Sequence, residues 1–203
     1  MQIITGIEQG SPEWLDLRLG LITCSEISTI RANGVGAQSY INGLAYELIN
    51  HEPAEVFQGN EWTKRGQQLE SKARQRYEEK TGYMVSMVSF VKNKGFGYSP
   101  DGLIIHDKIP IGGIEIKVKT PKTQVAILRS GEIPNEHTDQ LIGGLCCAEL
   151  QWMDFVSYCP NLPLFVKRVY ADDVRDKIEN IEALVKLYNE QTQAIKDKIL
   201  EMY

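Results

Sequence analysis

A strict alternation of apolar and charged residues runs from Ile114 to Val118 and predicts a β-strand. Side chains two positions apart on a strand point to the same side of the sheet, so Glu115 and Lys117 share one face. The apolar run 103–105 is bounded by turn-forming residues and predicts a second, buried strand. We expect the two strands to form a hairpin, with Asp101 at its edge because this residue lies between a proline and a glycine.

Apolar residues at helical spacing predict helices around this hairpin. The expected helices cover 11–19, begin at Thr23 (with capping-box spacing to Glu26) and at Ser39, cover about 60–80, 122–128 and 136–150, and follow Asp172. The glycine-rich segment 32–38 is expected to be a loop. Further strands are expected at 83–91, 152–159 and 164–170, the first of them pairing beside the strands of Asp101 and Glu115 in an antiparallel meander.

These elements predict an α/β (α+β) fold in which a central mixed, largely antiparallel sheet is flanked by helices. A chain of 203 residues is long enough for one full core and short for two. We therefore expect residues 1–203 to form a single domain.

Composition changes this picture little. Apolar residues make up 42% of the chain and charged residues 24%, as in ordinary globular domains. No apolar run of about 18 residues is present, and the first residues do not resemble a secretory signal, so a cytoplasmic protein without a membrane partner is expected. The four cysteines lack metal-binding spacing and are expected to be reduced and packed.

The net charge of −5 argues against a protein that coats nucleic acid non-specifically. It does not exclude a nuclease, because acidic outer surfaces can coexist with a local positive channel.

The hairpin carries the candidate chemistry. Asp101, Glu115 and Lys117 place two carboxylates and an ammonium on adjacent strands, which are costly to bury without compensation. Mg²⁺ provides such compensation, since it prefers oxygen ligands and usually takes one or two carboxylates. Lys117 would then activate a metal-bound water or stabilise charge on a phosphate. The alternative is an ordinary surface hairpin with a Glu–Lys pair.

Two helices offer further candidates. Glu70 lies in the expected helix 60–80 and is either a further acid at the metal site or a partner of Arg74. Gln140 falls one turn after His137 and could reach a metal-bound water or a phosphate, or remain a solvated amide. Gly143 and Gly144 follow in the same helix, where each costs about 1 kcal/mol relative to alanine, so a packing or functional reason is expected.

A candidate phosphate site precedes the hairpin. Arg18 and the hydroxyls of Thr23 and Ser25 surround the expected start of the second helix and could hold a phosphate. Alternatively, a hydroxyl caps the helix and Arg18 pairs with Asp16 or Glu13. Arg31, at the edge of the glycine-rich segment, either reaches a DNA backbone or is solvated.

The combination Pro100-Asp101…Glu115-Ile116-Lys117 resembles the core of the P-D…(D/E)-x-K, restriction-endonuclease-like nuclease superfamily. The chain also has, in order, an R-L-G-x-I-T-x-S segment, a G-x-x-x-E helix, S-P-D-G, E-I-K and a glutamine-bearing helix. This whole string, from about Gln9 to Tyr158, resembles the phage lambda exonuclease family, also called YqaJ-type viral recombinases.

The resemblance implies roles for single residues. The implied metal ligands are Asp101, Glu115, the carbonyl of Ile116 and, for a second metal, Glu70; Lys117 would activate the attacking water and Gln140 would orient it. The implied 5′-phosphate and DNA contacts are Arg18, Thr23 and Ser25, and Arg31 is the nearest match to a second family arginine. His137, one turn before Gln140, is a further candidate for these contacts.

The implied activity is that of a Mg²⁺-dependent 5′-to-3′ exonuclease with two metal ions, for which Mn²⁺ can substitute. Such an enzyme degrades one strand of linear duplex DNA and exposes 3′ single strands for phage-type recombination. The resemblance further implies double-stranded DNA ends with a 5′-phosphate as the substrate, a ring-shaped homotrimer, a single-strand annealing protein as partner and a phage or prophage gene in a bacterial host. The alternatives are a site- or structure-specific endonuclease on the same core and a non-catalytic DNA-end-binding recombination protein.

Overall fold

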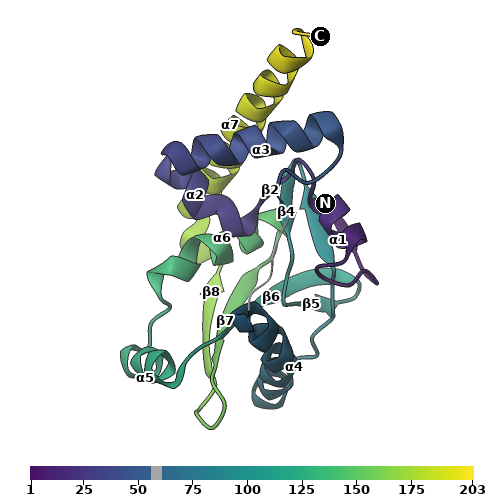
Figure 1. Ribbon diagram of the computed structural model, residues 1–203. Helices are drawn as coiled ribbons and strands as arrows, with labels where there is room; N and C mark the ends of the chain where they lie inside the picture. The colour runs from purple at the N-terminus through teal and green to yellow at the C-terminus, as the bar shows by residue number, and fades with distance from the viewer. Residues whose placement is uncertain (56–60) are drawn as a thin grey trace.

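The computed structural model describes the backbone of residues 1–55 and 61–203 and the side chains of residues 1–55 and 69–203. Within these residues the chain forms two four-stranded sheets with helices around them (Figure 1). One sheet has the order β1 (Gln2–Ile4), β3 (Phe90–Asn93), β4 (Phe96–Tyr98) and β2 (Ile22–Thr23); the other has the order β5 (Gly102–His106), β6 (Ile109–Val118), β7 (Trp152–Tyr158) and β8 (Phe165–Tyr170). The predicted fold class, mixed strands flanked by helices, is confirmed.

Both sheets combine parallel and antiparallel pairs. In the second sheet β5 and β6 form the predicted hairpin, β6 pairs with β7 in parallel, and β7 and β8 form the predicted second hairpin. A parallel pair needs a crossover connection. Here α5 (Pro121–Ser130), a 3₁₀ turn (Asn135–His137) and α6 (Thr138–Cys147) provide it, so the crossover brings α6 over the strand that carries Glu115 and Lys117.

The predicted strand at 83–91 is wrong in its extent and its partners. Only Phe90–Asn93 forms a strand, and it pairs with β1 and β4 instead of the strands of Asp101 and Glu115. The cause is a tight turn at Lys94 and Gly95, both with positive φ, which folds β3 directly onto β4. Of the residues before β3, Ser86 makes a single bridge to Leu103.

The predicted starts of the second and third helices are also wrong. Ile22 and Thr23 pair with β4, and a 3₁₀ turn (Cys24–Glu26) follows before α2 (Ile27–Ala32) begins, so Thr23 forms no capping box. Strand pairing therefore competes successfully with the local capping signal. Most of the predicted loop 32–38 is instead the first turn of α3 (Val35–Asn50), because Ala37 is buried in the core.

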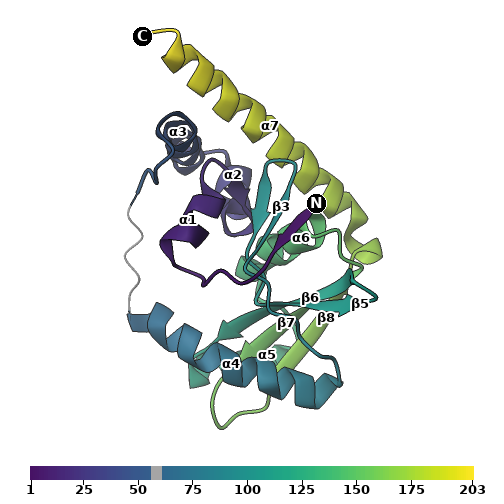
Figure 2. The ribbon, with the colours of Figure 1, turned by 90° about the vertical axis from the view of Figure 1, so that its right-hand side faces the viewer.

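The remaining helices agree with the sequence pattern. Helix α1 (Pro12–Arg18) has the expected cap, with the Trp14 N–H donating to the Ser11 hydroxyl at 3.2 Å. Helix α4 spans Glu61–Thr81, and Asn60, at which the pattern starts it, lies outside the described residues. A 3₁₀ turn (Asp172–Val174) precedes α7 (Arg175–Leu200), which runs past α3 and ends beyond the rest of the chain (Figure 2). No helix of the described residues is both long and apolar enough to cross a membrane.

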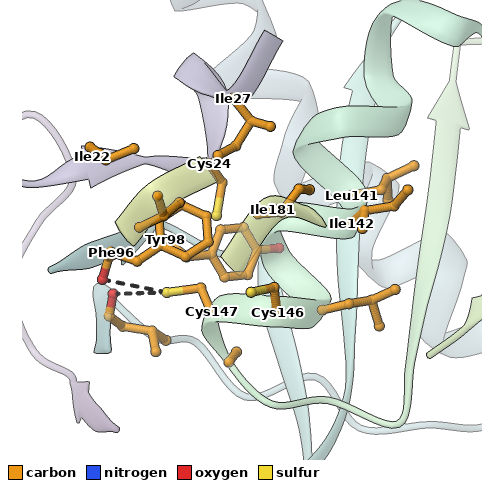
Figure 3. Packing of buried hydrophobic residues seen from close by; sticks show 14 of the residues in the cluster. Ile22, Cys24, Ile27, Phe96, Tyr98, Leu141, Ile142, Cys146, Cys147 and Ile181 are labelled. Atoms are coloured by element: carbon orange, nitrogen blue, oxygen red, sulfur yellow. Dashed lines mark hydrogen bonds between the residues drawn. The ribbon is translucent and has the colours of Figure 1, made fainter. Parts of the chain in front are cut away.

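The main core lies between α6 and the first sheet (Figure 3). Labelled residues of β4, α2, α6 and α7 meet there, and the Cys147 thiol donates to the carbonyl oxygens of Val91 and Phe96. All four cysteines are buried and free, as predicted.

The glycine pair of α6 has a packing reason. A Cβ built on Gly144 would lie 2.6 Å from Met153 Cε and 3.0 Å from the Tyr98 ring, while one on Gly143 would lie 3.3 Å from Cys24. The glycines therefore let α6 approach both β4 and β7 closely. This approach brings Gln140, at the start of α6, near the strand of Lys117.

A buried ion pair attaches α4 to the second sheet. The carboxylate of Asp154 on β7, 1% exposed, accepts two hydrogen bonds of 2.8 Å from Arg168 on β8 and one of 2.7 Å from the Tyr77 hydroxyl on α4. The Arg168 guanidinium also lies 3.5 Å above the Trp152 ring. The network fixes α4, and with it Glu70, against the strands that carry the other acids.

We expect Arg168→Ala to lower the free energy of unfolding by about 3–5 kcal/mol, because it leaves the buried Asp154 carboxylate without its cation. Urea denaturation measures this value. Arg175→Ala is the matched control, since Arg175 pairs with Asp172 at the exposed surface and the loss of this pair should change the free energy of unfolding little. Equal losses for the two variants would contradict this account of the network.

Candidate active site

The β5–β6 hairpin brings Asp101 and Glu115 together. Asp101 ends the connection from β4 to β5, and Gly102 pairs with Ile114 in the hairpin. This register places Asp101 beside the segment 115–116, where its Oδ2 accepts a 2.5 Å hydrogen bond from the Ile116 N–H. The hairpin predicted from the alternation thus places the two acids, Asp101 and Glu115, next to each other.

Glu115 is 2% exposed and has two side-chain partners. Its Oε1 lies 2.8 Å from Lys117 Nζ, and its Oε2 accepts a 3.4 Å hydrogen bond from the Tyr98 hydroxyl. Lys117 in turn donates to Gln140 Oε1 at 3.1 Å. Burial is the largest single effect and lowers the pKa of Lys117. The charge and hydrogen bond of Glu115, together with the charges of Asp101 and Glu70, outweigh it, so the net shift of the pKa is upward and the side chain is an ammonium at neutral pH.

Asp101 lies in the most strongly acidic surroundings of the site. Its pKa is raised well above the usual range by burial first, then by the charges of Glu115 and Glu70. Glu70, on α4, pairs with Arg74 at 2.5 Å, and Arg74 Nε also donates to the Asp101 carbonyl oxygen. The pairing of Glu70 with Arg74 was one of the two interpretations of the sequence, and it occurs. Glu70 nevertheless lines the same cavity as Asp101 and Glu115.

These residues line one cavity of about 400 Å³. Nine of the predicted site residues contribute to its wall: Arg18, Thr23, Ser25, Glu70, Asp101, Glu115, Ile116, Lys117 and Gln140. The candidate metal site and the candidate phosphate site, which are separated by about 45 to 120 residues in the chain, are thus two parts of the same cavity. We call them the acidic half and the phosphate half.

The phosphate half has Arg18 as its cation. The guanidinium lies 4.4 Å from the centre of the Trp14 ring, and burial lowers its pKa. Among the described residues Arg18 has no ion-pair partner, so the alternative pairing with Asp16 or Glu13 does not occur. The hydroxyls of Thr23 and Ser25 lie 3.2 Å apart beside it.

Several wall residues were not expected from the sequence: Gln9, Trp14, Cys24, Tyr98, Ser99 and Val118. Trp14 and Arg18 are one helical turn apart, a spacing that could have indicated their contact. Tyr98 and Ser99 directly precede the Pro100-Asp101 pair and could have been inferred as neighbours of the metal site. The Thr23 N–H donates a hydrogen bond to the Tyr40 hydroxyl at 3.2 Å. No pattern in the sequence indicates this contact.

Arg31 and His137 lie outside the wall of this cavity. Arg31, on α2, pairs with Asp139 at 3.0 Å. His137 stacks on Phe155 and its Nε2 lies 2.7 Å from Lys119 Nζ. Their assignment to phosphate or DNA binding stays a prediction that this geometry does not support.

The acidic half fits a divalent cation. Within the described side chains no three His, Cys, Asp or Glu residues are gathered as a metal-binding group. The implied ligands are instead two carboxylates, Asp101 and Glu115, and the carbonyl of Ile116, while Arg74 holds Glu70. Mg²⁺ is commonly bound by one or two carboxylates with water in its other positions. Burial and then the charges of Glu115 and Glu70 raise the pKa of Asp101, and a cation bound beside this carboxylate would lower it by favouring the ionised form.

We expect His137 to make folding sensitive to mild acid. Burial, followed by the charges of Lys119 and Lys117, lowers the pKa of His137 to about 4. Below pH 6.5, the ordinary pKa of histidine, His137 is protonated in the unfolded chain but remains neutral in the folded chain. The free energy of unfolding should therefore fall as the pH drops from 6.5 towards 4. His137→Gln should reduce this loss in melting temperature between pH 7.5 and 5, whereas His106→Gln, at the exposed end of β5, should not. An unchanged pH dependence in His137→Gln would contradict this assignment.

Comparison with known proteins agrees with the geometry. A family model described as the YqaJ-like viral recombinase domain matches residues 13–151. The structure of LHK-Exo in complex with dAMP is 29% identical with a TM-score of 0.78, and that of LHK-Exo, an alkaline exonuclease from Laribacter hongkongensis, is 30% identical with a TM-score of 0.77; each match covers 95% of this chain and 100% of the other.

A phage-related exonuclease from Haemophilus somnus 129PT shares the fold, with 15% identity, a TM-score of 0.56, and coverage of 88% of this chain and 96% of the other. Among curated protein sequences none matches significantly. The family match covers more than half of the chain and confirms the resemblance read from the motifs. The chain belongs to the YqaJ-like viral recombinase family.

Proposed function

We propose that this protein is a Mg²⁺-dependent exonuclease that degrades the 5′-ended strand of linear duplex DNA and leaves 3′ single strands for recombination. The observation that carries this proposal is the single cavity in which an acid–lysine cluster and an arginine–hydroxyl cluster face each other. The first cluster suits hydrolysis of a phosphodiester, and the second suits retention of a terminal phosphate.

The structural neighbours support this proposal. LHK-Exo is named an alkaline exonuclease and has been crystallised with dAMP, a deoxynucleoside that carries a 5′-phosphate. A nuclease that removes single nucleotides from a 5′ end releases products of this chemical class. The likeness spans nearly all of both chains, so the neighbour and this protein are comparable over their whole length.

The acidic half would hold the cation. Asp101, Glu115 and the Ile116 carbonyl are the proposed ligands, with Glu70 assisting a second ion, and Mn²⁺ is expected to substitute for Mg²⁺. When bound, such ions supply Lewis-acid stabilisation of phosphate oxygens and acidify a water molecule. Among the described side chains that line the cavity, Glu70, Asp101 and Glu115 carry the negative charge that would neutralise a bound cation.

The remaining side chains act on the substrate. Lys117, held as an ammonium beside Glu115, would stabilise negative charge on the phosphate under attack. Gln140 shares a hydrogen bond with Lys117 and would orient the attacking water. Arg18, stacked on Trp14 and without a carboxylate partner among the described residues, would form a charge-assisted bond to the 5′-phosphate, with Thr23 and Ser25 as further donors.

The wider setting of the activity is proposed from the family. We expect residues 1–203 to act as one nuclease domain, in a homotrimeric ring, with a single-strand annealing protein that takes over the exposed 3′ strand. We expect the protein to be phage- or prophage-encoded and to work in the bacterial cytoplasm. Light scattering of the purified protein measures the mass of the assembly.

We expect Asp101→Asn, Glu115→Gln and Lys117→Ala each to slow digestion of linear duplex DNA at least about 100-fold, because each removes charge that the transition state requires. End-labelled duplex with Mg²⁺ measures the rate, EDTA should stop it, and DNA binding measured by mobility shift should persist. Lys122→Ala, at an exposed position of α5, is the control. Wild-type digestion by any of the three variants would exclude this catalytic site, and cleavage of closed circular DNA would indicate an endonuclease instead.

We expect Arg18→Ala to slow digestion of 5′-phosphorylated duplex about 10- to 100-fold, since a hydrogen bond to a charged group is lost. Digestion of 5′-hydroxyl duplex should change little, so the ratio of the two rates is the informative quantity. Arg129→Ala, at the exposed end of α5, should leave this ratio unchanged. A similar loss on both substrates would show that Arg18 does not read the terminal phosphate.

A further inference from the structure

Arg74 contacts two acids of the cavity, although it is not itself one of the wall residues. It lies one helical turn after Glu70 on α4, and its side chain is 14% exposed. Its Nη2 donates a 2.5 Å hydrogen bond to Glu70 Oε1, and its Nε donates a 3.1 Å hydrogen bond to the Asp101 carbonyl oxygen. The two bonds join α4 to the connection that precedes β5, and the proposed reaction gives this arginine no role so far.

The two hydrogen bonds divide one edge of the guanidinium. Arginine commonly binds a carboxylate through two parallel N–H groups, which is its strongest arrangement. Here the Asp101 backbone takes Nε, so the bond to Glu70 is made through Nη2 to one carboxylate oxygen. The backbone bond does not depend on the state of any carboxylate. Arg74 therefore keeps an anchor even when Glu70 changes its partner.

The charges of the acidic half give this arginine an electrostatic task. Three carboxylates, Glu70, Asp101 and Glu115, line the acidic half. Among the described side chains, Lys117 forms an ion pair with Glu115 and Arg74 forms one with Glu70. Neighbouring carboxylates that are partly withdrawn from water repel one another unless a positive charge lies beside them. In the free protein Arg74 thus supplies a charge that a bound cation could also supply.

We propose that Arg74 is the counter-cation of the acidic half, which neutralises Glu70 while no divalent cation is bound and gives up this carboxylate when one binds. The bond from Nε to the Asp101 carbonyl persists in both states, so Arg74 is also a positioning residue for the backbone of this acid. The inference rests on the proposed function in that it takes the acidic half as the site of the cation. It adds that a cation must compete with an arginine, and that this competition sets the affinity of the site.

The proposal separates the charge of Arg74 from its packing. Without that charge, the acids repel one another in the metal-free protein, so the melting temperature in EDTA should fall. A bound cation replaces the missing charge and should therefore stabilise such a variant more than it stabilises the wild type. A residue that only packed α4 against the sheet would lose the same stability with and without the cation.

The test compares Arg74→Gln, which removes the charge and keeps an amide donor, with Arg74→Lys, which keeps the charge. Melting temperatures are measured in EDTA and in saturating Mn²⁺, and calorimetric titration of the metal-free protein measures the affinity for Mn²⁺. Arg74→Gln should melt below the wild type in EDTA and recover most of this loss in Mn²⁺. It should bind Mn²⁺ at least about 10-fold more tightly, the smaller of the effects that a charge commonly has on a neighbouring carboxylate.

Two controls accompany this comparison. Arg74→Lys should bind Mn²⁺ with an affinity close to that of the wild type. Arg31→Gln removes a cation that pairs with Asp139 outside the cavity wall, and it should change neither the affinity nor the stabilisation by Mn²⁺.

A double-mutant cycle with Glu70→Gln tests whether the arginine acts through this carboxylate. In the Glu70→Gln background, Arg74→Gln should raise the affinity for Mn²⁺ less than it does in the wild-type protein. Equal gains in the two backgrounds would show that Arg74 acts only as a distant charge, and the proposed exchange of partners would be wrong.

Unchanged or weaker Mn²⁺ binding by Arg74→Gln would overturn the proposal. The same holds for a melting temperature lowered equally in EDTA and in Mn²⁺, or for a gain in affinity by Arg74→Lys as large as that by Arg74→Gln. Digestion of duplex tests the exonuclease proposal separately. Tighter Mn²⁺ binding by Arg74→Gln in a protein that digests no DNA would refute the proposed function alone, whereas metal-dependent digestion with unchanged binding by Arg74→Gln would refute the role of Arg74 alone.

Discussion

The burial of two carboxylates on neighbouring strands is the constraint on which this structure depends. Glu115 is 2% exposed and Asp101 is partly buried beside it, so each carboxylate must be compensated by groups from elsewhere. The compensation comes from the N–H of Ile116, the ammonium of Lys117 and the hydroxyl of Tyr98. Burial and the charges of Glu115 and Glu70 nevertheless keep the pKa of Asp101 raised, and a bound cation would favour the ionised form of this carboxylate.

Meeting this constraint organises the elements around the β5–β6 hairpin. Helix α4 must lie against the sheet for Arg74 to contact both Glu70 and the Asp101 carbonyl, and the buried Asp154 network holds it there. Helix α6 must approach closely for Gln140 to meet Lys117, and Gly144 permits that approach. Features that look unrelated in the chain, a buried ion pair and a helix with two glycines, therefore serve the same pair of acids.

The sequence predicted the fold class and brought together nine residues that line one cavity, but it missed the arrangement of the first sheet. The hairpin, the acids and the phosphate segment were accessible because alternation and turn residues are local signals, and the order of motifs joined them through a known family. The first sheet could not be predicted from the sequence, because β1 and β2 are too short to show periodicity and depend on pairing with β3 and β4. Capping at Thr23 failed for the same reason: a long-range strand pair outweighed a local preference. Arg31 was assigned as the nearest match to a family arginine and His137 by its position one turn before Gln140, and neither argument indicates the partners, Asp139 and Lys119, that these residues have in the structure.

The two halves of the cavity differ in what fixes them. Asp101 and Glu115 of the acidic half are positioned by one hairpin, so their relative geometry follows from local register, and α4 adds Glu70. The phosphate half combines α1 with the end of β2, and both the parallel pairing of β2 with β4 and the packing of α6 against Cys24 set its position relative to Asp101. A change in that pairing would move Thr23 and Ser25 relative to the acids while leaving both clusters intact. The spacing between a held phosphate and the metal ligands is thus set in part by the first sheet, whose two-residue strand has no other evident role.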